Sequence, residues 1–184
     1  LDSREVGAIV VSPLAEPTSG ASRVRVQARE AGVPVVVATS GDVHQRGGVT
    51  WQVLAPTGTI PAGSESPPND SSVVLLVETG GVRLLLLGDE ETGSQRQLVR
   101  AWPGLHADVL KVAHHGSARQ DERLISGLGA RLALVSVGAD NDYGHPAPRL
   151  LAMLRAAGIP LRRTDRDGDI AVLDRGGLQV QTSK

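Results

Sequence analysis

Three segments of the chain place an acid or histidines soon after an apolar run. Asp89 follows RLLLLG, the pair His114 and His115 follows DVLKVA, and His145 lies in the segment that follows LALVSV. Carboxylate oxygens and imidazole nitrogens are ligands that zinc and other divalent metals take from proteins. If the apolar runs are strands of one open α/β sheet, their carboxyl ends meet at the edge where ligands usually bind. The pattern therefore indicates metal-assisted chemistry at that edge.

Each segment also has a purely structural interpretation. A Gly-Asp pair after an apolar run is often a turn that leads into a helix N-cap. Paired histidines can lie on a surface turn, and Gly-His-Pro is typical of a helix start. Three such segments in a row, each after an apolar run, are harder to explain by coincidence than one. His44 and His106 lie in polar stretches, and we expect both at the surface.

Composition limits the classes of protein that fit. The 184 residues carry a net charge of −1 and no cysteine, which excludes disulfides and thiolate metal sites. There is no basic excess, and the arginines are scattered along the sequence, so any DNA binding should be weak and without sequence preference. No apolar run approaches the roughly 20 residues that span a bilayer. The chain begins without Met, and we expect it to be a piece of a longer chain.

The apolar pattern predicts a single α/β domain with helices covering its sheets. Its late hairpins argue against a purely parallel sheet. Residues 57–70 are rich in Gly, Pro and Ser and should form a loop, and TDRDGD at 164–169 should form a hairpin turn. Strands are expected at 7–12, 33–39, 47–56, 107–115 and 131–138, a hairpin at 71–91, helices at 19–32, 90–102, 120–129 and 145–158, and three short strands at the end.

Four segments in this order resemble the metallo-β-lactamase-like C-terminal domain of ComEC-type DNA-uptake (competence) proteins. They are NDSSVVLLVETGGVRLLLLGDEE, ADVLKVAHHGS, VSVGADNDYGHP and RRTDRDGDIAV, and the resemblance is close over residues 47–173. It implies an αββα sandwich, a pair of zinc or manganese ions, and hydrolysis of phosphodiesters in DNA. It also implies a parent membrane protein that carries this domain on the extracytoplasmic side of the cell membrane. That domain is proposed to degrade the strand that is not taken up.

The resemblance assigns roles to individual residues. Asp89 matches the carboxylate that bridges the two metals, and His115 is the preferred histidine ligand. His114 is then a catalytic or substrate-facing neighbour. His145 is either a terminal metal ligand or a catalytic proton donor that contacts phosphate. Substrate-binding positions are expected at Asn69, Asp70, Ser71, Lys111 and Ser117, although burial or a surface ion pair suits Lys111 equally well.

One signature of the wider family, H-x-H-x-D-H or H-x-D-x-D-H, is absent from the chain. We therefore expect residues 1–184 to form one N-terminally truncated domain, with the motif and the first strands upstream of residue 1. With so few ligands the chain should hold divalent metal weakly, partially or not at all. The expected partners are DNA, a transmembrane channel domain of the same parent chain, and other DNA-uptake components.

Two other functions remain open on the sequence alone. The chain can be a non-catalytic DNA-channel or docking domain with an incomplete metal site. It can also be a metallo-hydrolase that acts on another substrate class, such as a lactone or another ester.

Overall fold

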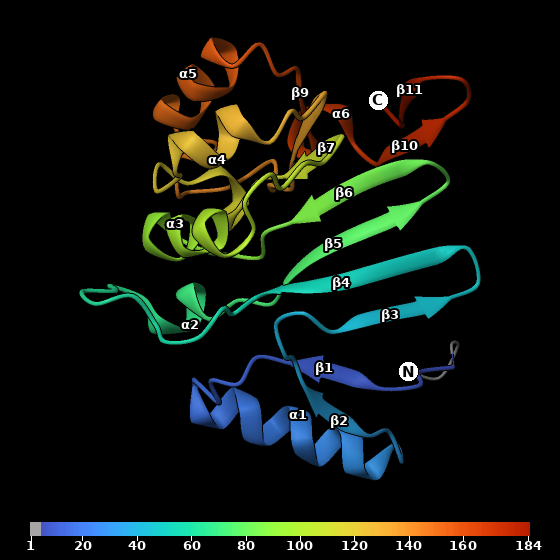
Figure 1. Ribbon diagram of the computed structural model, residues 1–184, viewed down its shortest axis with the longest axis vertical. Coiled ribbons are helices and arrows are strands. Elements are labelled where there is room, and N and C mark those ends of the chain that lie inside the picture. Colours follow the sequence, from blue (N-terminus) through green and yellow to red (C-terminus); the bar gives the residue numbers. More distant parts are fainter. Residues whose placement is uncertain (1–4) are drawn as a thin grey trace.

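A seven-stranded mixed sheet forms the centre of the protein in the computed structural model, which describes residues 5–184 (Figure 1). Its strand order is β3-β4-β5-β6-β7-β8-β9. The pairs from β3 to β6 are antiparallel and those from β6 to β9 are parallel. Short turns join β3 to β4 and β5 to β6, the longer segment 56–73 joins β4 to β5, and helical connections join the later, parallel strands. The bounds are β3 (Val43–Arg46), β4 (Val49–Ala55), β5 (Val74–Thr79), β6 (Val82–Leu86), β7 (Val109–Lys111), β8 (Leu132–Val135) and β9 (Leu161–Arg163).

The two faces of this sheet have different covers. Leu110 and Ala133 belong to the main core, together with residues of α3 (Thr92–Ala101), α4 (Glu122–Gly127) and α5 (Pro148–Ala156). Val109 and Leu132 alternate with them along the strands and belong to a second core cluster. That cluster packs against the hairpin of β10 (Ile170–Asp174) and β11 (Leu178–Thr182). Helices, a large sheet and a small sheet therefore form successive layers, which confirms the predicted α/β sandwich.

The N-terminal part is packed less completely. β1 (Ile9–Val11) and β2 (Val35–Val37) form a parallel pair connected by α1 (Thr18–Glu30), at the end of the molecule opposite α5 (Figure 1). Parallel sheets are normally covered on both faces. Here, however, Val10, Val36 and Val37 are 44%, 46% and 48% exposed. Val10 and Val36 are paired partners on one face and Val37 lies on the other, so apolar surface remains open on both faces of this two-stranded sheet in the described structure.

Several sequence-based predictions need correction. TDRDGD does not form a hairpin turn, because α6 (Thr164–Asp167) connects β9 to β10, and these two strands pair with different partners. The predicted loop at 57–70 ends in the short helix α2 (Pro67–Asp70). His44 is exposed as expected, but it lies on strand β3 with its ring stacked on Trp51. In the part of the chain that the structure describes, no helix has the length and apolar character to cross a membrane.

Candidate active site

The three segments singled out in the sequence meet around one cavity. Asp89 follows β6, the two histidines follow β7, and the loop that carries His145 follows β8. Because these three strands are parallel neighbours, their carboxyl ends lie along the same edge of the sheet. The residues that line the cavity are Asp89, His114, His115, Val137, Gly138, Asn141, Tyr143 and His145.

The backbone at the histidine pair has an uncommon conformation. His114 and His115 have φ values of 49° and 52°, in the left-handed region that non-glycine residues rarely adopt. The short helical turn η1 (His114–Gly116) is tied to the end of β6, since the backbone N–H of His114 donates to the carbonyl of Gly88 at 3.0 Å. A side chain at Gly88 would clash, because its Cβ would lie 2.7 Å from that of Ser72. Strained backbone conformations such as those of His114 and His115 are often found at functional sites.

The ring of His115 is oriented as a metal ligand would be. Its Nδ1 lies 2.8 Å from the carbonyl oxygen of Ser136, which can only accept, so Nδ1 carries the proton. Nε2 is then left with a lone pair, and it lies 3.9 Å from Oδ1 of Asp89. A backbone carbonyl that fixes the far nitrogen is a common support for a ligating histidine. Asp89 and His115 are also open to solvent, with side chains 41% and 52% exposed.

His114 faces a different environment. Its Nδ1 lies 3.8 Å from Oε1 of Glu91 and 3.5 Å from Nδ2 of Asn69. Glu91 is nearly buried, and its other oxygen accepts a 2.8 Å hydrogen bond from Arg119. Arg119 also pairs with Glu65. These contacts hold one side of the His114 ring, while its edge lies toward His145, with ring centroids 5.9 Å apart.

His145 is held in place through its backbone. The side chain of Asn141 accepts from its N–H at 3.1 Å and donates to its carbonyl at 2.9 Å. Burial lowers the pKa of His145, and the neighbouring His114 and His115 lower it further. Nδ1 of His145 is buried and has no hydrogen-bond partner among the described residues. His145 is therefore a neutral imidazole at physiological pH with one unsatisfied ring nitrogen.

The expected substrate-binding residues do not all reach the cavity. Asp70, Ser71 and Ser117 are buried, at 5%, 3% and 5% exposed, and hydrogen-bond inside the protein. Lys111 is half-buried with Nζ 3.5 Å from the carbonyl of Gly88. Burial lowers its pKa, and the nearby charge of Asp89 partly opposes this. Their roles toward substrate stay predictions, as do those of the other predicted site residues.

A metal site needs more ligands than these residues supply. Zinc in catalytic sites takes three protein ligands and a water. Within residues 5–184, no group of three or more His, Asp or Glu side chains converges as a metal site would require. The pair Asp89 and His115 fits one side of such a site but does not complete it.

Three residues that lie around the histidines were not predicted from the sequence to belong to the site. Glu91 lies two positions after Asp89 in GDEE and contacts His114, while Asn141 and Tyr143 precede His145 in the same loop. The ring of Tyr143 lies 6.2 Å from that of His145. The available signal was proximity in sequence to a predicted site residue, which does not distinguish these side chains from their neighbours.

The chain is similar in sequence to several curated proteins. The chain is 38% identical over 149 residues to ComE operon protein 3 of Bacillus subtilis, covering 80% of this chain and 19% of that protein. It is 37% identical over 116 residues to competence protein ComA of Neisseria gonorrhoeae, covering 61% and 17%. It is 29% identical over 139 residues to recombination protein 2 of Haemophilus influenzae, covering 74% and 17%. No protein-family model matches.

One solved structure shows a weak likeness. It is described as that of a metal-dependent hydrolase from Parabacteroides distasonis, and the match has a TM-score of 0.48 and 14% identity. The match covers 86% of this chain and 76% of the other, but with so low a TM-score and identity it does not establish a fold or a function. The chain spans about a fifth of the length of the curated relatives it matches. The sequence matches therefore make the chain a member of the ComEC-type family of competence proteins, homologous to one segment of those longer proteins.

Proposed function

We propose that this chain is part of a metal-dependent nuclease domain of a DNA-uptake membrane protein. The observation that carries the proposal is the orientation of His115, whose Nδ1 is fixed by Ser136 while Nε2 lies 3.9 Å from Asp89 at an open sheet edge. A carboxylate and an imidazole in this relation suit two sides of one divalent cation. Homology to competence proteins makes a DNA phosphodiester the proposed substrate. In the parent protein this domain is proposed to lie outside the cytoplasmic membrane and to degrade the strand that is not taken up.

The missing ligands are proposed to come from a part of the longer protein outside residues 5–184. Two observations support this. The described residues provide no complete ligand group, and the β1–β2 pair leaves Val10, Val36 and Val37 exposed where further strands can pack. An apolar sheet face of this kind is normally covered. One such part of the longer protein can therefore supply both the strands that cover the sheet and the missing ligands.

The chemistry of such a centre sets the tasks of this chain's residues. A bound metal pair lowers the pKa of water and stabilises both the attacking and the leaving oxygens of an in-line displacement. Asp89 and His115 hold their side of the centre. His145, neutral and with an unsatisfied ring nitrogen, is proposed to hydrogen-bond the phosphate, and His114 is held beside it by Glu91 and Asn69.

The proposal is tested by nuclease assays with Mn²⁺ on the longer parent protein. Asp89→Asn and His115→Ala should each reduce DNA hydrolysis on the order of a thousandfold, because a metal centre contributes several kcal/mol to the rate. His44→Ala is the matched control, since His44 lies on β3 and does not line the cavity, and it should keep wild-type activity.

Two results would contradict the proposal. Unchanged DNA hydrolysis in Asp89→Asn would place the centre elsewhere. Hydrolysis of lactone or ester substrates without hydrolysis of DNA would assign the site to another class of metallo-hydrolase.

A further inference from the structure

Four arginines from residues 155–166 gather in one groove of the folded protein. The groove has a volume of about 500 Å³ and lies between α5, β9 and α6. Its charged lining consists of four arginines and one aspartate: Arg155, Arg162, Arg163, Arg166 and Asp167. In a chain with a net charge of −1, this is a local excess of positive charge that suits an anionic ligand.

The four arginines divide into two kinds. Arg163 is nearly buried and pairs with Asp165, and Arg162 lies 3.5 Å from Asp167. Arg155 and Arg166 are exposed, and neither forms a close ion pair with any of residues 5–184, although the charge of Arg166, after that of Arg163, acts on Asp165. The first two therefore build the wall of the groove. The second two are left to meet a charge from outside.

The lining also contains apolar side chains. Leu154 and Ile159 are buried at 2% and 7% exposure, and both border the groove. Guanidinium groups bind phosphate oxygens with two hydrogen bonds in one plane. The partly buried Leu151 and Leu161 complete an apolar floor that suits the sugar carbons of a nucleic-acid strand, whereas a free phosphate ion would not use it.

The groove adjoins the candidate active site through a hydrogen-bonded junction. Arg163 pairs with Val135 across β9 and β8, and β9 is the outermost strand of the seven-stranded sheet. The next residue, Thr164, donates to the carbonyl of Val137 at 2.7 Å and accepts from its N–H at 2.8 Å. Val137 lines the cavity that contains Asp89 and His115. The groove and the cavity therefore border the neighbouring ends of β9 and β8.

We propose that Arg155 and Arg166 bind the phosphate backbone of a DNA strand and direct it toward the Asp89–His115 cavity. This inference rests on the proposed nuclease function for its ligand, but it concerns a separate binding surface. Such a surface reads no bases, because arginine contacts to phosphates carry no sequence information.

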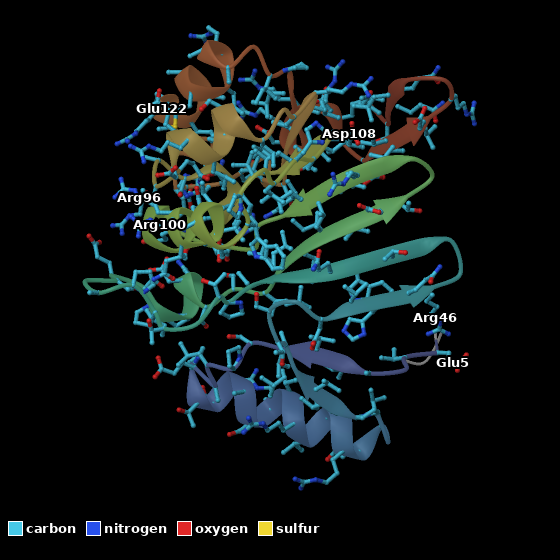
Figure 2. The ribbon with its side chains drawn as sticks, in the orientation of Figure 1. Glu5, Arg46, Arg96, Arg100, Asp108 and Glu122 are labelled. Atoms are coloured by element: carbon cyan, nitrogen blue, oxygen red, sulfur yellow. The ribbon has the colours of Figure 1, made fainter. Side chains whose placement is uncertain are left out.

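A second arginine group provides a matched control. It lies over α3 and α4 and contains Arg96, Arg100, Arg123 and Arg149 around Asp121 and Glu122. Figure 2 labels Arg96, Arg100 and Glu122 on this helical side of the molecule. The lining there is polar, with Thr92, Gln120 and Ser126, and it lacks the apolar floor. Arg96 pairs with the buried Asp121 at 3.0 Å, whereas Arg100 and Arg123 are exposed and form no ion pair with any of residues 5–184. Replacing Arg100 and Arg123 therefore removes the same charge from a surface that is not proposed to bind DNA.

The experiment is fluorescence anisotropy of a labelled, mixed-sequence single-stranded oligonucleotide with the 184-residue chain, without metal, from about 50 to 200 mM salt. Arg155→Gln/Arg166→Gln should weaken binding at least about tenfold at the lowest salt. It should also reduce the slope of log affinity against log salt by about 1.4, since each lost single-strand phosphate contact contributes about 0.7. Arg100→Gln/Arg123→Gln should change affinity by less than about twofold. Thermal unfolding of both variants checks that they fold alike.

Each remaining outcome overturns the inference. Equal losses in the two double variants would show general electrostatic attraction, and no loss in Arg155→Gln/Arg166→Gln would show that the groove does not bind DNA. Loss of binding to vesicles containing phosphatidylserine, with oligonucleotide binding unchanged, would assign the groove to a lipid surface. Because no metal is present, these results do not depend on the nuclease assay, and failure of that assay leaves them standing.

Discussion

Two polar regions lie side by side near the ends of β6 and β7. In one of them the polar side chains are buried and hydrogen-bonded within the protein, and in the other they are open to solvent. In the buried network under α2 and α3, Asp70 accepts from Ser64 at 2.6 Å and from Ser94 at 2.7 Å, and Gln95 is fully enclosed. At the cavity, Asp89 and His115 are open and 3.9 Å apart. Polar groups that are satisfied internally hold the structure, whereas polar groups left open at an edge are available to a ligand.

Glu91 and Arg119 connect the two regions. Arg119 joins Glu91 to Glu65, and Glu91 lies beside His114. The satisfied network therefore supports one wall of the cavity. This difference between the two regions predicts that substitutions in the buried network change stability, while substitutions at the open edge change ligand binding.

The largest effect on stability that does not depend on pH is expected for Gln95→Leu. The side chain donates to the carbonyl of Glu90 at 2.8 Å and to Gln120 at 3.1 Å, and it accepts from the N–H of Asp121 at 2.7 Å. Leucine keeps the volume but leaves these buried groups unsatisfied. We expect the free energy of unfolding to fall by about 2–4 kcal/mol, measured by urea denaturation. A loss below about 0.5 kcal/mol would remove the distinction between the two regions.

An effect that depends on pH is expected for Glu90→Gln. Burial and then the charge of Asp70 raise the pKa of Glu90 from 4.5 to about 8. The folded state therefore keeps a proton that the unfolded state releases, so this group stabilises the fold most below pH 4.5. That stabilisation is lost as pH rises to about 8, at about 1.4 kcal/mol per pH unit. Glutamine should remove this slope.

Urea unfolding of wild type and Glu90→Gln across this pH range measures the difference. The variant should gain stability relative to wild type as pH increases. Two parallel stability curves would mean that Glu90 is ionised in the folded protein.

The smallest effect on stability is expected for Asp89→Asn. The Asp89 side chain is 41% exposed and packs against no core cluster. Its replacement should change the free energy of unfolding by less than about 0.5 kcal/mol in the absence of metal. A loss comparable to that of Gln95→Leu in the same urea titration would make Asp89 a structural residue.

Much of the fold follows from local patterns in the sequence. The β5–β6 hairpin is readable because apolar runs flank Thr79-Gly80-Gly81, and the strand ends that carry Asp89 and His114 follow long apolar runs. β3 was not predicted because VHQR is a fully exposed edge strand without apolar alternation. α6 was not predicted because TDRDG has the composition of a turn.

The site was predictable in part, for a physical reason. Residue types and strand ends bring Asp89, His115 and His145 to one edge. The orientation of His115, however, depends on a carbonyl 21 residues away, at Ser136. Similarly, Glu91 becomes a neighbour of His114 only when the ends of β6 and β7 meet. Such long-range contacts leave no local signal in the sequence.

The most direct test of the account is a titration of the purified 184-residue chain with Zn²⁺ by isothermal calorimetry. Because Asp89 and His115 are an incomplete ligand set, we expect weak Zn²⁺ binding, with a dissociation constant on the order of micromolar or higher. Asp89→Asn or His115→Ala should abolish it, and His44→Ala should not change it. Stoichiometric zinc retained through dialysis, or binding that survives Asp89→Asn, would contradict the assignment of this edge as one side of a metal centre.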